Sequence, residues 1–584
     1  LLEQIHRLVD GRKASVTPDL QPELIAEANR QRGNYRSNIL KPKQIEAAKR
    51  LRNMGNITVR KADKAAMLVL IPTDEYLQKI DSILADESKF KKISRDPTLT
   101  TTRKANKIIE AINAVVGNAK LPKIVGDYRP GYLYGNVKTH KRGNPLRPII
   151  SQIPTPTYNL AKKLNGILSP HIPKENCFES SRNFLDAINS APEGGVISSL
   201  DVESLFTNVP VERTINYICE HIYRSDDHPL LDIPEAHLRT LLKICTQESA
   251  FRCPRGNLYL QVDGVAMGSP LGVLFANFFM GSVEKEVFDE VDRPLVYGRY
   301  VDDIFIKTNT PEEREALRRK FEQVSGLRFT TEEDNQGSLP FLDVLVKQDN
   351  EGRVSTSVYT KPTNPGLCLN GESECPQRYK DTTIAAFFRR ALTHCSSWAA
   401  TVKEFDRVCQ LLVNNGHSNH DCKRVKQRIL SKWREQQQQQ QQQATEEGEE
   451  VELKLFYKAF MSTAYKEEEK AIKSIVSRNV KPNNDNNKIK LIIYYKSRKT
   501  KDLLMKNDNA PEPRKFDQVN VVYRFSCPHE DCTPHSTYIG MTTTKLSRRL
   551  SYHLNSGGPK RHMLNHGISI NRNILEENTS PLEH

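Results

Sequence analysis

Two adjacent carboxylates, Asp302 and Asp303, stand between two short runs of strand-forming residues. Residues 295–300 (LVYGRY) precede the pair and residues 304–306 (IFI) follow it, so the acids fall where two strands meet. Adjacent negative charges repel each other, and their burial is costly unless a cation neutralises them. The sequence therefore predicts a β-hairpin whose acidic turn attracts a metal ion.

A third carboxylate, Asp201, ends another strand-like run upstream, residues 196–200 (VISSL). Three carboxylates at strand ends suit a pair of Mg²⁺ ions about 3.5–4 Å apart, with Mn²⁺ as the alternative metal. Such ions activate an attacking oxygen and stabilise a leaving pyrophosphate. We therefore predict that Asp201, Asp302 and Asp303 are metal ligands and catalytic residues.

The charge balance points to a polyanionic partner. The 584 residues include 86 Lys and Arg against 71 Asp and Glu, which gives a formal net charge of +15. This excess favours nucleic acid, and the alternative is a soluble protein that is merely basic. The eleven scattered cysteines do not form a secreted disulfide framework, so we expect an intracellular, reducing compartment. No apolar stretch reaches the ~18–20 residues of a membrane span, so no membrane partner is expected.

A glutamine run, Gln436–Gln443, passes into the acidic residues 446–450 and marks a domain boundary. Residues 453–476 then predict a helix. The basic residues 496–501 (KSRKTK) can serve as a nuclear import signal, and the alternative is a solvated linker. We expect a nuclear protein that begins before Leu1 and continues beyond His584.

Between the first acid and the acidic pair lies a glycine-rich segment, residues 261–272 (QVDGVAMGSPLG). Its Gly264 and Gly268, followed by Ser-Pro, predict a close-approach loop that enters a helix. That helix carries Leu274, Phe275, Phe278 and Phe279 at core spacing. After the acidic pair, residues 339–346 (LPFLDVLV) predict a further strand.

This order of motifs resembles the palm of reverse transcriptases, and its details are similar to those of Penelope-like retroelements, relatives of telomerase. The matching segments are 204–210 (SLFTNVP), 266–270 (AMGSP), 300–303 (YVDD), 339–343 (LPFLD), 132–135 (YLYG), 145–151 (PLRPIIS) and 357–363 (SVYTKPT). The resemblance implies an α+β multidomain right-hand polymerase with a small α/β nuclease-like unit. The expected domains are an N-terminal helical extension (1–57), fingers (58–190), palm (191–346), a helical thumb-like or helix-turn-helix region (347–432), a linker (433–518) and the nuclease-like unit (519–584).

The same resemblance implies a nucleotide-binding set. Phe206 falls where these enzymes use an aromatic gate against a ribose 2′-hydroxyl, Arg147 and Lys138 where they clamp the triphosphate, and Gln261 and Gly268 where they contact nucleotide and template. Alternatives remain open, because Arg147 can be a surface arginine and Phe206 a core aromatic. Lys141 and Arg142 compete with Lys138. We expect Asp343 to be structural, and helices over 382–393 and 398–414.

The C-terminal unit begins with two tyrosines, Tyr523 and Tyr538, the second followed by Gly540, and Arg549 and His553 come next at i, i+4 on one helix face. This pattern resembles GIY-YIG endonucleases, in which such residues position a water and the scissile phosphate. That family holds its metal with a glutamate on a later helix, beyond Glu576 and Glu577. We therefore expect no nuclease activity from these residues alone.

Two cysteines and two histidines of this unit have zinc-like spacing: Cys527, Cys532, His562 and His566. His535 and His553 compete as ligands. A structural Zn²⁺ would stabilise a small domain that buries little core. The alternative is reduced surface thiols beside unrelated histidines.

The sequence thus predicts an RNA-directed DNA polymerase, with an RNA template, a DNA primer or target and deoxynucleoside triphosphates as partners. One alternative is a catalytically decayed, nucleic-acid-binding relic of such an element. Another is a site-specific endonuclease whose polymerase domain only binds its RNA.

Overall fold

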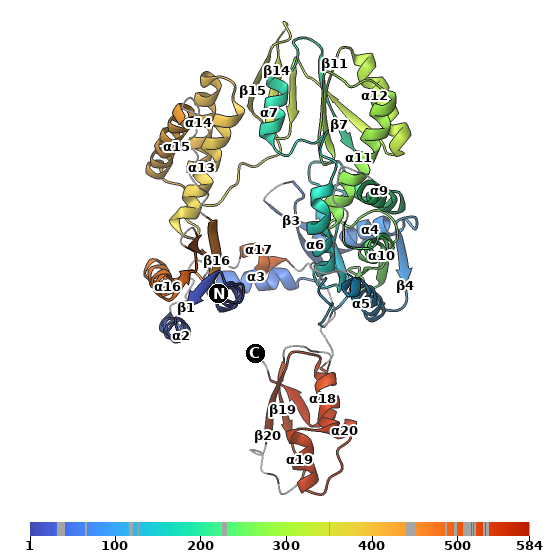
Figure 1. The fold of residues 1–584 in the computed structure, drawn as a ribbon, viewed down its shortest axis with the longest axis vertical. Coiled ribbons are helices and arrows are strands. Elements are labelled where there is room, and N and C mark those ends of the chain that lie inside the picture. The colour runs from blue at the N-terminus through green and yellow to red at the C-terminus, as the bar shows by residue number, and fades with distance from the viewer. Residues whose placement is uncertain are drawn as a thin grey trace. The chain divides into compact units, whose positions relative to one another are not determined.

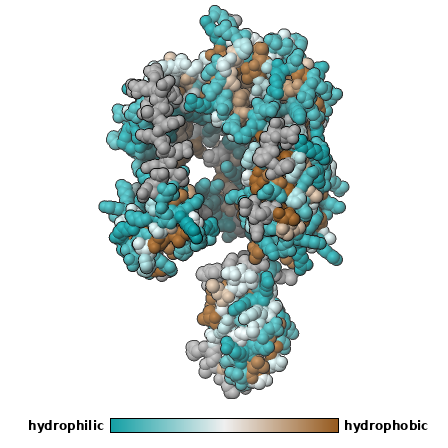
Figure 2. Space-filling model, viewed as in Figure 1, coloured by the Kyte–Doolittle hydropathy of each residue, from teal (hydrophilic) through white to brown (hydrophobic). Residues whose placement is uncertain are grey.

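The computed structural model describes residues 1–31, 41–64, 67–115, 121–126, 128–224, 231–349, 351–439, 451–484, 487–495, 499–505, 515–516, 518, 521–529, 532 and 537–582. Residues 440–450, which hold part of the glutamine run and the acidic segment, lie outside this set, as do the basic residues 496–498 and His535. Among the described helices, none has the length and apolar character needed to span a bilayer. Hydrophilic residues prevail on the face drawn in Figure 2.

Contacts divide the chain into two units, one of residues 1–73, 179–197 and 333–506 and the other of residues 74–178, 198–332 and 507–584. We describe the parts of each unit separately.

A four-stranded sheet holds the predicted acids. Its order is β10 (Val296–Tyr300), β11 (Asp303–Thr308), β7 (Val196–Val202), β12 (Phe329–Glu333). The central strands β11 and β7 are almost entirely buried, including polar residues such as Ser198 and Lys307. The helices α9 (Val211–Tyr223), α11 (Gly272–Glu290) and α12 (Pro311–Ser325) share one core with them, and Figure 1 shows α12 beside β11.

A five-stranded sheet carries the expected finger residues. Its order is β4 (Phe90–Ile93), β9 (Leu258–Gln261), β8 (Ala250–Arg252), β5 (Gly131–Val137), β6 (Leu146–Ser151). Buried and half-buried residues alternate along β5, so one face packs inward. The surrounding helices are α4 (Thr73–Leu84), α5 (Thr98–Val115), α6 (Thr157–Leu168) and α10 (Glu235–Thr246).

In the other unit, a three-stranded meander of β13 (Ser338–Phe341), β14 (Val344–Gln348) and β15 (Val354–Val358) contacts helix α13 (Gln377–His394). The helix α7 (Ser181–Asn189) packs Phe184 onto Phe341 of this meander, with ring centroids 4.8 Å apart. Helices α13, α14 (Trp398–Asn414) and α15 (Asn419–Gln439) form a bundle with its own core. The two helices expected at 382–393 and 398–414 are confirmed as α13 and α14.

Residues 451–495 fold with the N-terminal residues, although the sequence predicts a linker and a helix over 453–476. β16 (Val451–Ala459) pairs in parallel with β18 (Asn487–Tyr495), and α16 (Tyr465–Asn479) connects them through β17 (Val480–Pro482). α1 (Leu2–Asp10), β1 (Ala14–Val16) and α2 (Leu20–Gln31) join this core, and β1 pairs with β17. Figure 1 draws the N-terminal elements in dark blue next to α16 in orange. Pairing with a distant strand overrides the helical pattern.

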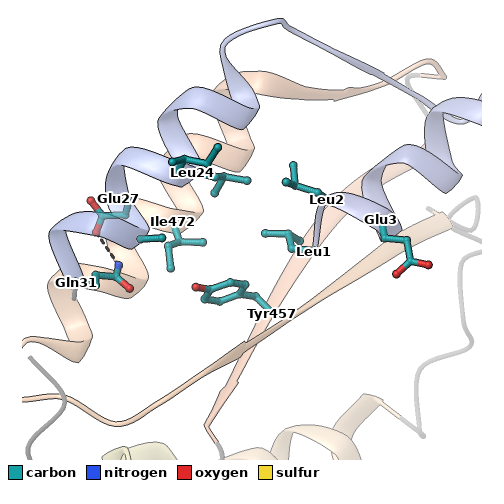
Figure 3. A pocket seen from close by; sticks show the side chains of 10 residues that line it. Leu1, Leu2, Glu3, Leu24, Glu27, Gln31, Tyr457 and Ile472 are labelled. Atoms are coloured by element: carbon teal, nitrogen blue, oxygen red, sulfur yellow. Dashed lines mark hydrogen bonds between the residues drawn. The ribbon is translucent and has the colours of Figure 1, made fainter. Parts of the chain in front are cut away.

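An apolar pocket of about 360 Å³ lies among these elements. Figure 3 shows Leu1, Leu2, Leu24, Tyr457 and Ile472 around it. Gln31 Nε2 donates a hydrogen bond of 2.7 Å to Glu27 Oε1 at its edge. The unit is completed by α3 (Pro42–Asn53), the hairpin of β2 (Ile57–Lys61) and β3 (Leu68–Pro72), and α17 (Thr500–Leu504).

The C-terminal residues form a small sheet in the order β20 (Thr537–Thr542), β19 (Val521–Ser526), β21 (Thr579–Pro581). The helices α18 (Leu546–Asn555), α19 (Gly558–Asn565) and α20 (Arg572–Glu577) accompany it. Among its described residues, seven buried side chains make the core, including Tyr523, Leu550 and Leu575. So small a core makes an additional constraint such as a metal ion valuable.

Candidate active site

The acidic pair lies at the tip of the β10–β11 hairpin, as the sequence predicts. Tyr300 pairs with Asp303, which leaves Val301 and Asp302 as the two central residues of the turn. Val301 has φ +59°, whereas Asp302 keeps a negative φ. Two-residue hairpins favour such turns because they match the strand twist, but the first central position normally takes glycine. A β-branched residue there costs about 1–3 kcal/mol, which the surrounding structure must offset.

Asp201 lies on the strand next to this turn. β7 neighbours β11, and the Val202 N–H donates a hydrogen bond of 3.3 Å to the Asp302 carbonyl. Asp201 is exposed, whereas the residues on both sides of it in β7 are buried. The fold therefore brings the three predicted carboxylates to adjacent strand ends with access to solvent.

These carboxylates are oxygen donors of the kind that Mg²⁺ and Mn²⁺ prefer. In the described part of the chain, their oxygens do not all lie within 4.8 Å of one another. A bound ion would therefore draw the side chains together. Their residue types and placement fit a divalent metal site.

Beneath the turn lies a buried ion pair that the sequence analysis does not predict. Arg299 of β10 and Glu284 of α11 have side chains that are 0% and 2% exposed, with 2.5 Å between Nε and Oε1. Burial opposes the charge on Arg299, but Glu284 raises its pKa above the ordinary value. Burial and Glu284 also raise the pKa of Tyr297, which donates a hydrogen bond of 2.9 Å to Glu284. Glu284 is one of four acidic residues on α11, so no sequence signal distinguishes it as the partner of Arg299.

Phe206 lies in the short helix α8 (Leu205–Asn208), and its ring contacts the start of α11. A Cβ at Gly272 would lie 3.6 Å from that ring, in ordinary contact. The Val265 N–H donates a hydrogen bond of 2.7 Å to the Phe206 carbonyl. Gly264 has φ +72°, and a Cβ there would lie 2.4 Å from the Thr207 carbonyl oxygen. The glycine-rich loop thus holds the backbone of α8, which carries Phe206, the predicted gate against a ribose 2′-hydroxyl.

Two residues of the predicted nucleotide-binding set help hold the loop itself. Gln261, only 3% exposed, donates a hydrogen bond of 3.2 Å from Nε2 to the Asp263 carbonyl. Gly268 has φ +129°, and a Cβ there would lie 2.4 Å from the Ile150 carbonyl oxygen. The Ile150 N–H donates to the Met267 carbonyl at 3.0 Å, so the loop lies against β6.

The two predicted triphosphate clamps lie on the β5–β6 hairpin. Arg147 of β6 is opposite Asn136 of β5, and Lys138 directly follows β5. The Lys138 N–H donates to the Pro145 carbonyl at 2.9 Å and extends the hairpin. Both cations are half-buried, so they lie on the partly open face of the sheet. Lys141 and Arg142 are exposed beyond it.

The nuclease-like residues of the C-terminal unit cluster around one phenol. The Arg549 Nε donates a hydrogen bond of 3.2 Å to the Tyr523 Oη, and the same hydroxyl shares a hydrogen bond of 2.7 Å with His553 Nε2. The Tyr538 ring centroid lies 6.3 Å from that of Tyr523. A Cβ at Gly540 would lie 2.4 Å from the Tyr523 Oη, so this position needs glycine. Burial raises the pKa of Tyr523, and burial and Arg549 lower that of His553.

The predicted zinc ligands also come together. One ligand atom each of Cys527, Cys532 and His562 lies within 4.8 Å of the others. The Cys532 Sγ is 3.3 Å from His562 Nε2 and 3.4 Å from His566 Nε2. Two thiols and two imidazoles in this arrangement fit a tetrahedral Zn²⁺. Of the competing histidines, His553 is instead bonded to Tyr523.

The helical bundle presents cations on α15, some of which are already paired. Arg424 donates hydrogen bonds of 2.9 and 2.7 Å to Asp381 of α13, while Val425 is buried. Lys423, Gln427 and Arg428 are exposed. The bundle therefore has a polar, basic outer face of the kind that contacts nucleic-acid backbones.

Two family models match the chain. Residues 139–328 match "Reverse transcriptase (RNA-dependent DNA polymerase)", which includes the acidic turn, Asp201 and the glycine-rich loop. Residues 367–427 match "Animal helix-turn-helix domain", which covers α13, α14 and the start of α15. Among curated proteins, no sequence matches the chain.

Among solved structures, the chain is similar to telomerase from Candida albicans in complex with a fragment of telomeric RNA. The identity is 12% and the TM-score 0.41, over 73% of this chain and 72% of that one. Apo telomerase from Candida tropicalis has 10% identity and a TM-score of 0.38, over 62% and 65% of the two chains. The Sicinivirus 3Dpol RNA-dependent RNA polymerase has 12% identity and a TM-score of 0.32, over 53% and 66%.

The reverse transcriptase family model matches the residues that build the acidic turn and most of its sheet. The chain carries a reverse transcriptase domain, and it is an enzyme of the RNA-directed DNA polymerase class.

Proposed function

We propose that this chain is the reverse transcriptase of a Penelope-like retroelement, which extends a DNA 3′-hydroxyl on an RNA template. The observation that carries the proposal is the placement of Asp201 beside the Asp302–Asp303 turn within the reverse transcriptase domain. The family motifs at 204–210, 266–270 and 339–343 support the finer assignment.

Asp201, Asp302 and Asp303 would hold two divalent ions, Mg²⁺ or Mn²⁺. When bound, such ions activate the attacking hydroxyl and stabilise the pyrophosphate that leaves. The three carboxylates fix the position at which the primer end and the α-phosphate meet. The new phosphodiester forms between the primer 3′-oxygen and the α-phosphorus as the bond to pyrophosphate breaks.

The residues around the acids would select and orient the nucleotide. Arg147 and Lys138 bind the triphosphate charge, because guanidinium and ammonium groups pair with phosphate oxygens. The Phe206 ring stands against the position of a ribose 2′-hydroxyl, which favours deoxynucleotides. Gln261 and Gly268 keep the loop under the nucleotide and template in place.

Two further parts complete the proposal. The basic face of α15 would contact the backbone of the template–primer duplex. The cluster of Tyr523, Tyr538, Arg549 and His553 would orient a water and a scissile DNA phosphate, as part of a GIY-YIG nicking domain that supplies the primer. A structural Zn²⁺ held by Cys527, Cys532, His562 and His566 would stabilise that domain. We place the protein in the nucleus, with its DNA target.

Primer extension tests the polymerase proposal directly. Wild type would be incubated with an annealed RNA template and DNA primer, Mg²⁺ and deoxynucleotides, beside Asp302→Asn/Asp303→Asn. Asp292→Asn is the matched control, because Asp292 is an exposed acid outside the turn. Extension by wild type and the control, but not by the double variant, supports the proposal. If folded wild type binds the duplex and adds no nucleotide, the chain is a nucleic-acid-binding relic.

A further inference from the structure

Arg299 is among the largest side chains that the fold buries completely, and it stands one residue before the acidic turn. A guanidinium carries five N–H donors and loses its water on burial, so each donor needs an acceptor inside the protein.

All five donors of Arg299 have a partner. Nε donates to Glu284 Oε1 at 2.5 Å, and one terminal nitrogen donates to Glu284 Oε2 at 3.2 Å and to Cys177 Sγ at 3.3 Å. The other terminal nitrogen donates to Asn277 Oδ1 at 2.9 Å and to the Val301 carbonyl at 3.1 Å. The guanidinium therefore joins α11, the segment before α7 and the acidic turn at one point.

The contact with Val301 reaches the strained residue of the turn. Val301 has φ +59°, a conformation that a β-branched residue rarely adopts. Its carbonyl belongs to the same peptide unit as the Asp302 nitrogen, so a donor that holds this oxygen fixes the peptide plane leading into Asp302. Charge-assisted hydrogen bonds are among the stronger ones available for this purpose.

The backbone around Arg299 is also fixed. The Arg299 N–H donates to the Asn176 carbonyl at 2.8 Å, and the Phe178 N–H donates to the Arg299 carbonyl at 2.8 Å. The outer edge of β10 is thus bonded to residues 176–178. The guanidinium starts from a rigid strand, as a positioning group requires.

Stability alone does not account for this arrangement. Replacement of a buried ion pair by well-packed apolar residues is often neutral or stabilising. Glu284 holds the guanidinium in one orientation through two oxygens, and that orientation directs the remaining N–H at Val301.

We propose that Arg299, oriented by Glu284, is a positioning residue that holds the Val301 peptide in its left-handed conformation and so sets Asp302 for metal binding. The inference rests on the proposed polymerase function. It assigns to Arg299 a role in metal affinity and turnover through the turn, without contact to substrate.

The test uses Arg299→Lys, Val301→Gly and the two combined, in the full chain. Lysine keeps the charge beside Glu284 but lacks the fork that reaches both Glu284 and the Val301 carbonyl. Glycine adopts a positive φ freely, so the turn no longer depends on the donor. We expect Arg299→Lys to lower kcat at least tenfold and to raise the Mg²⁺ concentration for half-maximal extension several-fold. In the combined variant, Val301→Gly should restore most of the lost kcat and most of the lost Mg²⁺ affinity.

Arg213→Met/Glu286→Met is the matched control. It removes a partly exposed ion pair that also joins α11 to a neighbouring element, with the two side chains 35% and 55% exposed. We expect it to leave the Mg²⁺ dependence unchanged. Thermal unfolding should place each variant within about 5 °C of wild type.

A second readout does not require turnover. Mn²⁺ binding, followed by the loss of free-ion paramagnetic resonance signal, should weaken in Arg299→Lys and recover with Val301→Gly. Absence of extension by wild type would refute the polymerase proposal, while this titration would still decide the role of Arg299. Unchanged metal dependence and kcat in folded Arg299→Lys, or no recovery with glycine, would overturn the inference.

Discussion

The hydroxyl of Ser181 on α7 donates a hydrogen bond of 2.6 Å to the carboxylate of Asp343 in the β13–β14 turn. The same carboxylate lies 2.9 Å from Arg390 Nε and 3.0 Å from His394 Nε2, both on α13. Burial alone would raise the pKa of Asp343, but the contacts with His394, Ser181 and Arg390 lower it well below its usual range. Asp343 thus ties two helices to the meander, which agrees with the structural role expected from the sequence.

Asp343→Asn should therefore weaken this unit in a pH-dependent way. The folded pKa is below the unfolded value of about 3.9, so the stabilisation is complete above about pH 4 and is lost as the pH falls further. At pH 7 we expect a loss of about 1 kcal/mol, because the side chain is 38% exposed and solvent screens its charge. The difference in the free energy of unfolding between Asp343→Asn and wild type should shrink below about pH 4.

Urea unfolding followed by tryptophan fluorescence measures this effect, since the two tryptophans of the chain, Trp398 and Trp433, lie on α14 and α15. Asp406→Asn, an exposed acid on α14, is the control and should match wild type at every pH. If the free energy of unfolding differs between Asp343→Asn and wild type by the same amount from pH 7 to pH 3, the charge of Asp343 does not stabilise this unit.

Gly298→Ala should destabilise the strand that leads into the acidic turn. A Cβ at Gly298 would lie 2.0 Å from the Phe178 ring, and that ring is buried, so strand or ring must shift. Overpacking of this kind costs about 1–3 kcal/mol. Hydrogen exchange of β10 peptides and thermal unfolding both measure it.

Gly166→Ala provides the matched comparison for Gly298→Ala. Gly166 lies in α6 with nothing within 4 Å of an added Cβ, so alanine should stabilise the chain by about 0.5–1 kcal/mol. Equal effects of the two substitutions would show that the Phe178 contact is not what limits position 298.

Phe206→Ala should relax the choice between deoxynucleotides and ribonucleotides. Removal of the ring opens space beside Gly272, and we expect ribonucleotide incorporation relative to deoxynucleotide incorporation to rise at least about tenfold. Single-nucleotide extension gives the two kcat/KM values. Phe288→Ala, at an aromatic that packs against the same core, should lower both values together. An unchanged ratio in Phe206→Ala would assign the ring to the core.

Cys532→Ser should release zinc and loosen the C-terminal unit. We expect wild type to contain about one equivalent of zinc and the variant less than a fifth of that, measured by inductively coupled plasma mass spectrometry. Faster hydrogen exchange should be confined to residues 521–582. Cys375→Ser, a thiol in the other unit, should keep the metal. If purified wild type contains no zinc, and its hydrogen-exchange rates equal those of Cys532→Ser, the proposed zinc site is refuted.

Much of the palm-like part could be predicted because its signals are local. The strands around Asp302–Asp303, the β7 strand that carries Asp201, and the entry to α11 after the glycine-rich segment each follow from short apolar runs and turn residues. Arg299 could not be placed in this way. A charged residue in a strand normally indicates a solvent-facing side chain, and the sequence does not show which of the four acids on α11 pairs with Arg299.

The fold of residues 451–495 escaped the sequence analysis for a different reason. The helix expected over 453–476 is confirmed from Tyr465 onward as α16, whereas residues 453–459 belong to the strand β16. The neighbouring strand β16 gains its partner, β18, only through a parallel connection, and its core includes residues of α1 and α2. No local pattern reports a pairing between such distant segments.

The pairing of Ala14 with Pro482 affects how the protein folds during its synthesis on the ribosome. A ribosome adds about 5–20 residues per second, so β1 leaves the exit tunnel tens of seconds before β17 exists. During that time Ile5, Leu20 and the other core residues of the first helices lack the partners that cover them in the finished chain. This unit must therefore be among the last to close, and its unpaired N-terminal segment is where a nascent-chain chaperone would bind.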